Sequence, residues 1–178
     1  MRLRYRARQL WHALTATPAP ADLELARQTL SPAQMELFLQ LQPNEQAHSL
    51  QIYRQLREPK PVDEDLLVAA LLHDVGKISY PLRPWERVWI VIGKAFLPAK
   101  AVEWGQARPR GWKRPFVIAE QHAAWGADLA ARAGTSPTAI SLIRRHQLAL
   151  NQPESDPVVS TSHENQLLQR LQLLDDES

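Results

Sequence analysis

Signals for the starts and ends of helices recur along the whole chain and constrain its fold more than any other feature. Ser31, Asn44 and Asp63 each stand before an apolar stretch of helical period, and a proline follows Ser31 in the first turn. No stretch of useful length alternates apolar and polar residues with the period of a β-strand. The pattern predicts an all-α fold, a single compact helical bundle.

The expected helices are bounded by capping residues. Gly76 and Gly134 are expected to close two of them, Ser136 to open another, and Thr161 with Glu164 to form a capping box for the last one. The polar, proline-containing stretches 59–61 and 151–157 are expected to be connectors. The helices are predicted over about residues 32–41, 44–57, 63–74, 115–133, 137–146 and 165–176.

Composition limits the chemistry. With 178 residues, 44% of them hydrophobic and 22% charged, the chain fits one globular domain rather than a disordered or fibrous protein. It has no cysteine, so a disulfide, a thiolate nucleophile and a sulfur-ligated zinc site are excluded, and a metal would be held by histidines and carboxylates. No apolar stretch reaches the about 18 residues of a membrane span, and no signal peptide is seen. We expect a cytoplasmic protein.

The charge is unevenly distributed. The net charge is +2, but residues 1–14 carry +4 and residues 77–114 carry +7, while residues 15–76 and 115–178 are acidic. A nucleic-acid-binding protein usually shows a basic face over the whole domain. The pattern therefore favours a local anion site, and a nucleic-acid partner is less expected.

Four histidines and two aspartates lie on apolar faces or beside an apolar turn, whereas His12 and His163 align with polar positions and are expected in solvent. A lone inward histidine is more often a hydrogen-bonded core residue than a ligand. A set of six would be costly to bury unless it converged on cations. Nitrogen and oxygen ligands suit manganese, iron, magnesium, nickel or zinc, as one ion or two. The six are His48, His73, Asp74, His122, His146 and Asp175.

Three segments of the chain resemble a known family. His48, the string ALLHDVGK and the ending LLDDES resemble the H…HD…D pattern of the HD-domain metal-dependent phosphohydrolases, over about residues 44–178. The resemblance implies metal binding by His48, His73, Asp74 and Asp175, with Leu174 in place of the usual alanine.

Two further segments imply a second ion. HAAWGADLA resembles the H-P-x-x-G-A segment of the family, with Ala123 in place of proline, and LIRRHQ resembles the histidine-bearing helix of binuclear members. The resemblance places His122 and His146 on the second ion and makes Asp74 a bridge between the two. The Gly-Tyr-Pro of the HD-GYP branch is absent after His146, so the chain resembles a small stand-alone HD or HDIG-type protein instead.

The function implied by this resemblance is hydrolysis of a phosphate ester of a nucleotide or similar small phosphorylated molecule by metal-activated water. Asp74 and Lys77 are the expected catalytic residues, and Lys77, Arg144 and Arg145 are candidates for binding the substrate phosphate. Lys77 could instead only favour a helix C-terminus, and the two arginines could be solvated. The alternative function is a catalytically silent, metal-holding regulatory or interaction domain that binds a phosphorylated ligand or a partner protein.

The remaining parts carry no known motif. Residues 1–43 are expected to form a helical extension that packs on the HD-type domain of residues 44–178, which contains a basic insertion at about 81–115 with four of the six tryptophans. The insertion could contact single-stranded bases or an anionic membrane surface. It could instead form two short helices that pack Trp89, Ile90, Ile92 and Phe96 on the core or on a second copy. A third alternative is a lid whose basic residues select phosphorylated substrates.

Overall fold

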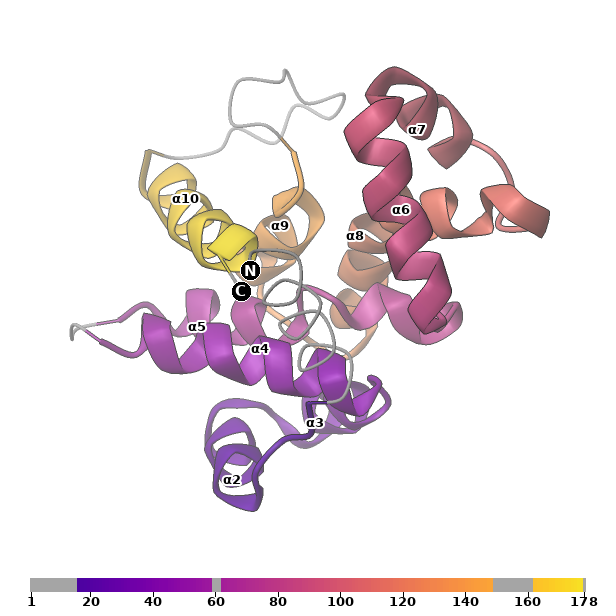
Figure 1. Ribbon diagram of the computed structural model, residues 1–178. Helices are drawn as coiled ribbons and strands as arrows, with labels where there is room; N and C mark the ends of the chain where they lie inside the picture. Colours follow the sequence, from indigo (N-terminus) through magenta and orange to yellow (C-terminus); the bar gives the residue numbers. More distant parts are fainter. Residues whose placement is uncertain (1–15, 59–61, 149–161, 178) are drawn as a thin grey trace, which may run out of the picture.

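The computed structural model describes residues 16–58, 62–148 and 162–177, and in these ranges it contains helices and turns but no strand. The predicted all-α fold is confirmed (Figure 1). The described residues form α-helices, labelled α, and two 3-10 helices, labelled η. In chain order they are α2 (Pro20–Thr29), α3 (Pro32–Leu39), α4 (Pro43–Leu56), α5 (Glu64–Leu72), η1 (Val75–Ser79), α6 (Pro84–Phe96), α7 (Pro98–Gly105), η2 (Gly111–Lys113), α8 (Arg114–Arg132), α9 (Pro137–Arg145) and α10 (Ser162–Glu177).

Side-chain caps explain several of these boundaries. The Ser31 hydroxyl accepts a hydrogen bond from the Gln34 amide at 3.3 Å, and the Gln34 side chain accepts one from the Ser31 amide at 2.9 Å. Asp63 caps α5 by accepting from the amide of Asp65 at 2.9 Å, and Ser136 caps α9. Gly134, at φ +75°, follows the end of α8 as predicted.

Two predicted boundaries need correction, and a third, the capping box of the last helix, stays a prediction. Helix α4 begins at Pro43, so Asn44 lies inside its first turn and is not the cap. Gly76 does not follow the end of a helix but lies buried inside η1. Thr161 lies outside the described residues, and the Glu164 carboxylate accepts hydrogen bonds from Ser141 and Arg145.

The core surrounds α5, which is apolar on nearly all sides. Leu66, Ala69, Ala70, Leu71 and Leu72 are fully buried. Helices α2, α3, α4, α9 and α10 pack against α5 (Figure 1). Helix α10 also packs against α4 and α9, so residues far apart in the sequence meet beside α5.

The turn after α5 is held against α8 by a close backbone contact. A Cβ atom at Gly76 would lie 1.9 Å from the His122 carbonyl oxygen and 2.7 Å from the Gly126 amide nitrogen. Only glycine permits this approach. The glycine pair Gly76 and Gly126 therefore fixes the distance between the HDVGK turn and α8.

Helices α6 and α7 form a pair that lies against α8, at the side of the molecule away from α2 (Figure 1). The prediction of two short helices in the insertion is confirmed, but their packing on the core is not. The side chains of Trp89, Ile92 and Phe96 are 41%, 42% and 79% exposed, and Ile90 is only half-buried. None of the described helices combines the length and the apolar character needed to cross a membrane.

Candidate metal centre

The six predicted ligands form two triads at the end of α5. The ligand atoms of His48, His73 and Asp175 lie within 4.8 Å of one another, and so do those of Asp74, His122 and His146. Ring contacts connect the two groups, with His73 and His146 centroids 5.1 Å apart. Residues from α4, the α5–η1 junction, α8, the end of α9 and α10 meet here, so the whole bundle is required to build the cluster.

Three of the histidines are oriented by the backbone. The Nδ1 atoms of His73, His122 and His146 lie 2.9, 2.8 and 2.7 Å from the carbonyl oxygens of residues 70, 118 and 143. In a neutral imidazole, an Nδ1–H that donates to a carbonyl leaves Nε2 as an unprotonated lone pair, the arrangement usual for metal-ligating histidines. Burial disfavours a charged His73, but Asp74 and Asp175 raise its pKa to about 9, so a bound cation would take the place of the proton on this ring.

The Nε2 atoms of these three histidines are buried and make no hydrogen bond to the described residues. Buried polar atoms without a partner are rare in native proteins and costly to retain. Three of them beside two carboxylates fit a site for divalent cations, because cations would satisfy every one of these lone pairs.

Asp74 stands between the two triads. Its Oδ1 atom is 3.2 Å from His122 Nε2, while its Oδ2 atom is 3.5 Å from His73 Nε2. Burial works against its charge, but Lys77 and His73 hold the pKa of this carboxyl well below its usual range. Asp74 is thus an ionised carboxylate whose two oxygens face different triads.

Asp175 connects the C-terminal helix to the cluster. Its Oδ1 atom is 2.9 Å from His48 Nε2 and 3.5 Å from His73 Nε2. Despite burial, these histidines lower the pKa of Asp175. Burial, together with the charges of His73 and His122, lowers the pKa of His146 to about 3, so His146 is neutral and able to act as a ligand at neutral pH.

A cationic network extends from the cluster. Lys77 Nζ lies 2.6 Å from Asp74 Oδ2 and 3.3 Å from Glu45 Oε2, and Arg87 of α6 also contacts the Glu45 carboxylate. Burial opposes the charge of Lys77, but Asp74 and Glu45 raise its pKa above the usual value.

A cavity of about 260 Å³ opens beside the two carboxylates Asp74 and Asp175. Metal-ligand candidates and cationic side chains share its wall, so an anionic molecule in this cavity would contact both. Its lining consists of Asn44, Glu45, His48, Asp74, Lys77, Arg87, Gln147 and Asp175.

Not every predicted residue lies at this cavity. Arg144 extends to the surface, where it pairs with Asp128 at 2.9 Å, and Arg145 donates to Glu164 and Asn165. Neither arginine lines the cavity, so their role in binding substrate phosphate stays a prediction. His163 is exposed as expected, and His12 lies outside the described residues.

Two residues were missed by the sequence reasoning. Glu45 lies three positions before His48 and is 3% exposed, so its position on the same face of α4 was a usable signal. Arg87 lies in the insertion and gave no local signal, because its contact with Glu45 spans 42 positions of the chain.

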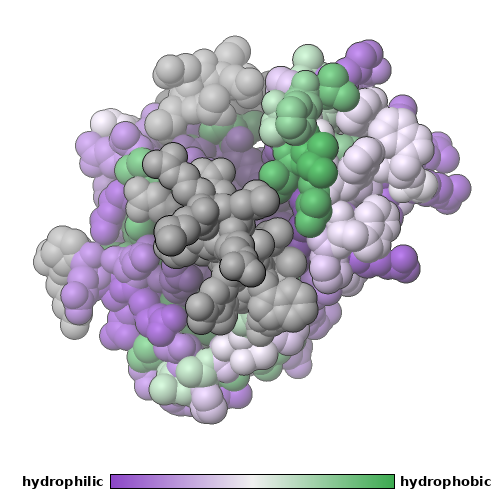
Figure 2. Space-filling model, viewed as in Figure 1, coloured by the Kyte–Doolittle hydropathy of each residue, from purple (hydrophilic) through white to green (hydrophobic). Residues whose placement is uncertain are grey.

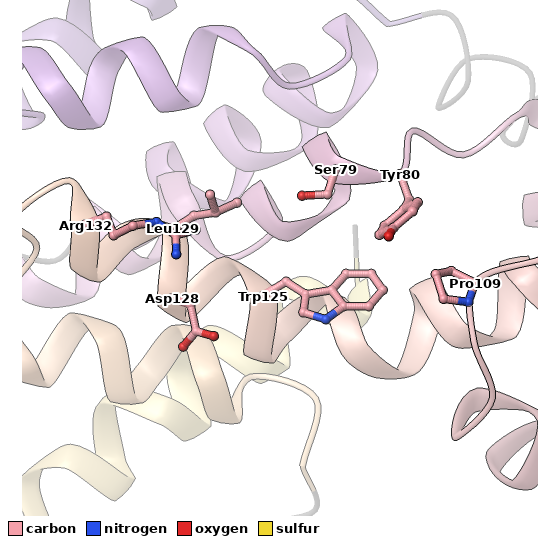
Figure 3. Close-up of a pocket in the computed structure, with 7 residues that line it drawn as sticks. All are labelled: Ser79, Tyr80, Pro109, Trp125, Asp128, Leu129 and Arg132. Atoms are coloured by element: carbon pink, nitrogen blue, oxygen red, sulfur yellow. The ribbon is translucent and has the colours of Figure 1, made fainter.

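A second cavity, of about 320 Å³, lies between η1 and α8 and contains none of the metal-ligand candidates (Figure 3). The Trp125 indole and the Tyr80 ring point toward each other in it, with centroids 5.1 Å apart. The lining is Ser79, Tyr80, Pro109, Trp125, Asp128, Leu129 and Arg132.

Comparison with known proteins agrees with this geometry. The family model of the HD domain matches residues 45–176, so the chain belongs to the HD-domain family. The predicted membership is confirmed, and it places the protein in a superfamily of metal-dependent phosphohydrolases, whose domains bind divalent metals. No curated protein and no solved structure shows a significant match to the chain.

Proposed function

We propose that this protein is a metal-dependent phosphohydrolase that cleaves a phosphate ester of a nucleotide or a similar small phosphorylated molecule. The observation that carries the proposal is the convergence of two carboxylates, Asp74 and Asp175, with three buried imidazole nitrogens that make no hydrogen bond to the described residues. These two carboxylates also line a cavity together with Lys77 and Arg87. A merely structural metal site would not need cationic side chains at an open cavity.

Each triad would hold one divalent ion. His48, His73 and Asp175 would bind the first, and Asp74, His122 and His146 the second, with Asp74 also facing the first through its other oxygen. Such ions lower the pKa of a bound water to about 7 and stabilise negative charge on a phosphoryl oxygen.

The chain's own residues would bind and orient the substrate. Lys77 keeps a fixed positive charge at the cavity because Asp74 and Glu45 hold its ammonium group in place. Arg87 adds a planar donor that suits two phosphate oxygens at once. The cavity, of about 260 Å³, is slightly smaller than the about 300 Å³ at the lower end of the usual range for ligand sites. It therefore suits a phosphate with its adjoining sugar or alcohol.

The test is phosphate release from a panel of nucleotides and sugar phosphates by the full chain, stripped of metal with a chelator and then supplied with Mn²⁺. We expect release from at least one substrate with Mn²⁺ and none without it. Metal binding with no turnover of any substrate would instead favour the regulatory domain that binds a phosphorylated ligand.

The number of bound ions gives an independent prediction. We expect about two equivalents of metal per chain by elemental analysis. We expect His146→Asn to retain about one, because it removes a ligand from the second triad only. His163→Asn is the matched control, since His163 is exposed and pairs only with Asp63 among the described residues. Equal metal content in wild type and His146→Asn would contradict the second site.

Arg87 gives a prediction about substrate binding. We expect Arg87→Gln to raise KM about tenfold with a smaller change in kcat, because it removes one charge-assisted hydrogen bond to phosphate. Lys94→Gln on the same helix is the control, because Lys94 is exposed and does not line the cavity. An unchanged KM in Arg87→Gln would remove Arg87 from the proposed binding site.

A further inference from the structure

Helix α6 presents an apolar face to solvent. Counted from Trp85, the residues at i+3, i+4, i+7 and i+11 are apolar and exposed, a spacing that places them on one side of a helix. We call this the α6 face; it consists of Trp85, Val88, Trp89, Val91, Ile92 and Phe96, between 39% and 79% exposed.

The opposite side of the same helix contacts the protein. Glu86 and Gly93 are buried, and a Cβ at Gly93 would meet the Phe116 ring at 2.3 Å. Arg114 pairs with Glu86 at 2.5 Å and joins α6 to the start of α8. The orientation of α6 is therefore held by these contacts, and its apolar residues are turned outward. Figure 2 shows a hydrophobic strip at the place of α6.

Exposed positive charge accompanies the α6 face. Within residues 83–113, the side chains of Arg83, Lys94, Arg108, Arg110 and Lys113 make no ion pair with any described residue. The first four of these residues are exposed. An apolar face beside unpaired lysines and arginines, with tryptophans among its residues, has the composition of surfaces that lie in the interface of a membrane.

The charge and the side-chain types of the α6 face distinguish between three kinds of partner: a second copy of the chain, a single-stranded nucleic acid and a lipid bilayer. A symmetric contact with a second copy would bring the same positive side chains of residues 83–113, those that have no ion pair among the described residues, against one another. Single-stranded nucleic acid would match the charge but requires aromatic rings for stacking, whereas half of the face is aliphatic, namely Val88, Val91 and Ile92. A bilayer with anionic lipids matches both the charge and the aliphatic surface.

We propose that the α6 face docks this protein on the surface of a bilayer that contains anionic phospholipids. The apolar side chains enter the boundary between headgroups and acyl chains, and the surrounding lysines and arginines contact lipid phosphates. The inference does not depend on the proposed hydrolase activity.

The test is cosedimentation of the full chain with vesicles of phosphatidylcholine, with and without about 30 mol% phosphatidylglycerol. We expect binding to the anionic vesicles only, and a decrease as salt is raised from about 0.1 M to about 1 M. Phe96→Glu should weaken binding by about tenfold or more. The substitution replaces an inserted aromatic side chain by a negative charge, which the negatively charged lipid repels. Phe96 is 79% exposed, so the variant should fold normally, as circular dichroism can verify.

Leu39→Glu is the matched control, because Leu39 is an exposed leucine of α3, 44% exposed, and the charge change is the same. It should bind vesicles like the wild type. Equal binding by Phe96→Glu and wild type would overturn the proposal and point to another basic segment, such as residues 1–14. Absence of vesicle binding would also overturn the proposal. In that case, a wild-type dimer that Phe96→Glu dissociates would assign the α6 face to a second copy, and binding of an oligonucleotide would assign it to nucleic acid.

Discussion

Replacement of Asp74 by alanine should lower phosphate release by about a thousandfold or more, because Asp74 is the residue whose carboxylate faces both metal triads. The loss should appear in kcat, measured with saturating Mn²⁺ and substrate. The metal content should fall below that of the wild type as well.

The fold should survive this substitution. Lys77 loses Asp74 but keeps Glu45 at 3.3 Å, so its charge is not left without a partner. The control is Asp128→Ala, an aspartate with a 58% exposed side chain that pairs with Arg144 at the surface. It should retain full activity. Retained activity in Asp74→Ala would refute the assignment of Asp74 to the metal site and would place the hydrolytic site elsewhere.

Gly76→Ala should destabilise the protein by about 3 kcal/mol and lower its melting temperature by about 10 °C. The reason is steric: the new Cβ would lie 1.9 Å from the His122 carbonyl oxygen, and a backbone atom cannot move away as a flexible side chain can. Relief of this clash must separate η1 from α8. Since Asp74 and His122 are on these two elements, activity should also fall in the molecules that remain folded.

Gly134→Ala is the comparison for this effect. Gly134 has a φ of +75°, and a Cβ added there would have no heavy atom within 4 Å, so alanine meets only the backbone penalty of about 1 kcal/mol. Thermal unfolding followed by circular dichroism measures both variants. A Gly76→Ala protein as stable as Gly134→Ala would show that the contact between η1 and α8 can open at little cost.

The convergence of the candidate ligands could be predicted because local periodicity decides which side of a helix a residue occupies. Asp175 and Asp176 are adjacent, yet the spacing to Leu168 and Leu171 selects Asp175, which contacts His48 and His73, while Asp176 is exposed. The string HDVGK added a family resemblance that the match over residues 45–176 confirms.

The same reasoning could not predict a residue's partners where its environment depends on distant parts of the chain. Arg144 and Arg145 flank His146 in sequence, but their partners are Asp128 in α8 and residues of α10. For α6, periodicity identifies an apolar face but not the direction in which it points. Of the alternatives left open for Ile92 and Phe96, packing on the core does not occur, since both side chains are exposed.

By itself the sequence determined the helical class, most helix ends and the inward side of each ligand, because these depend on neighbours within about one or two turns. Tertiary structure alone decided that His48 and Asp175, 127 positions apart, come within 2.9 Å, that Arg87 reaches the cavity, and that the α6 face is exposed. These outcomes depend on how the helices pack around α5, which involves contacts between residues far apart in the chain.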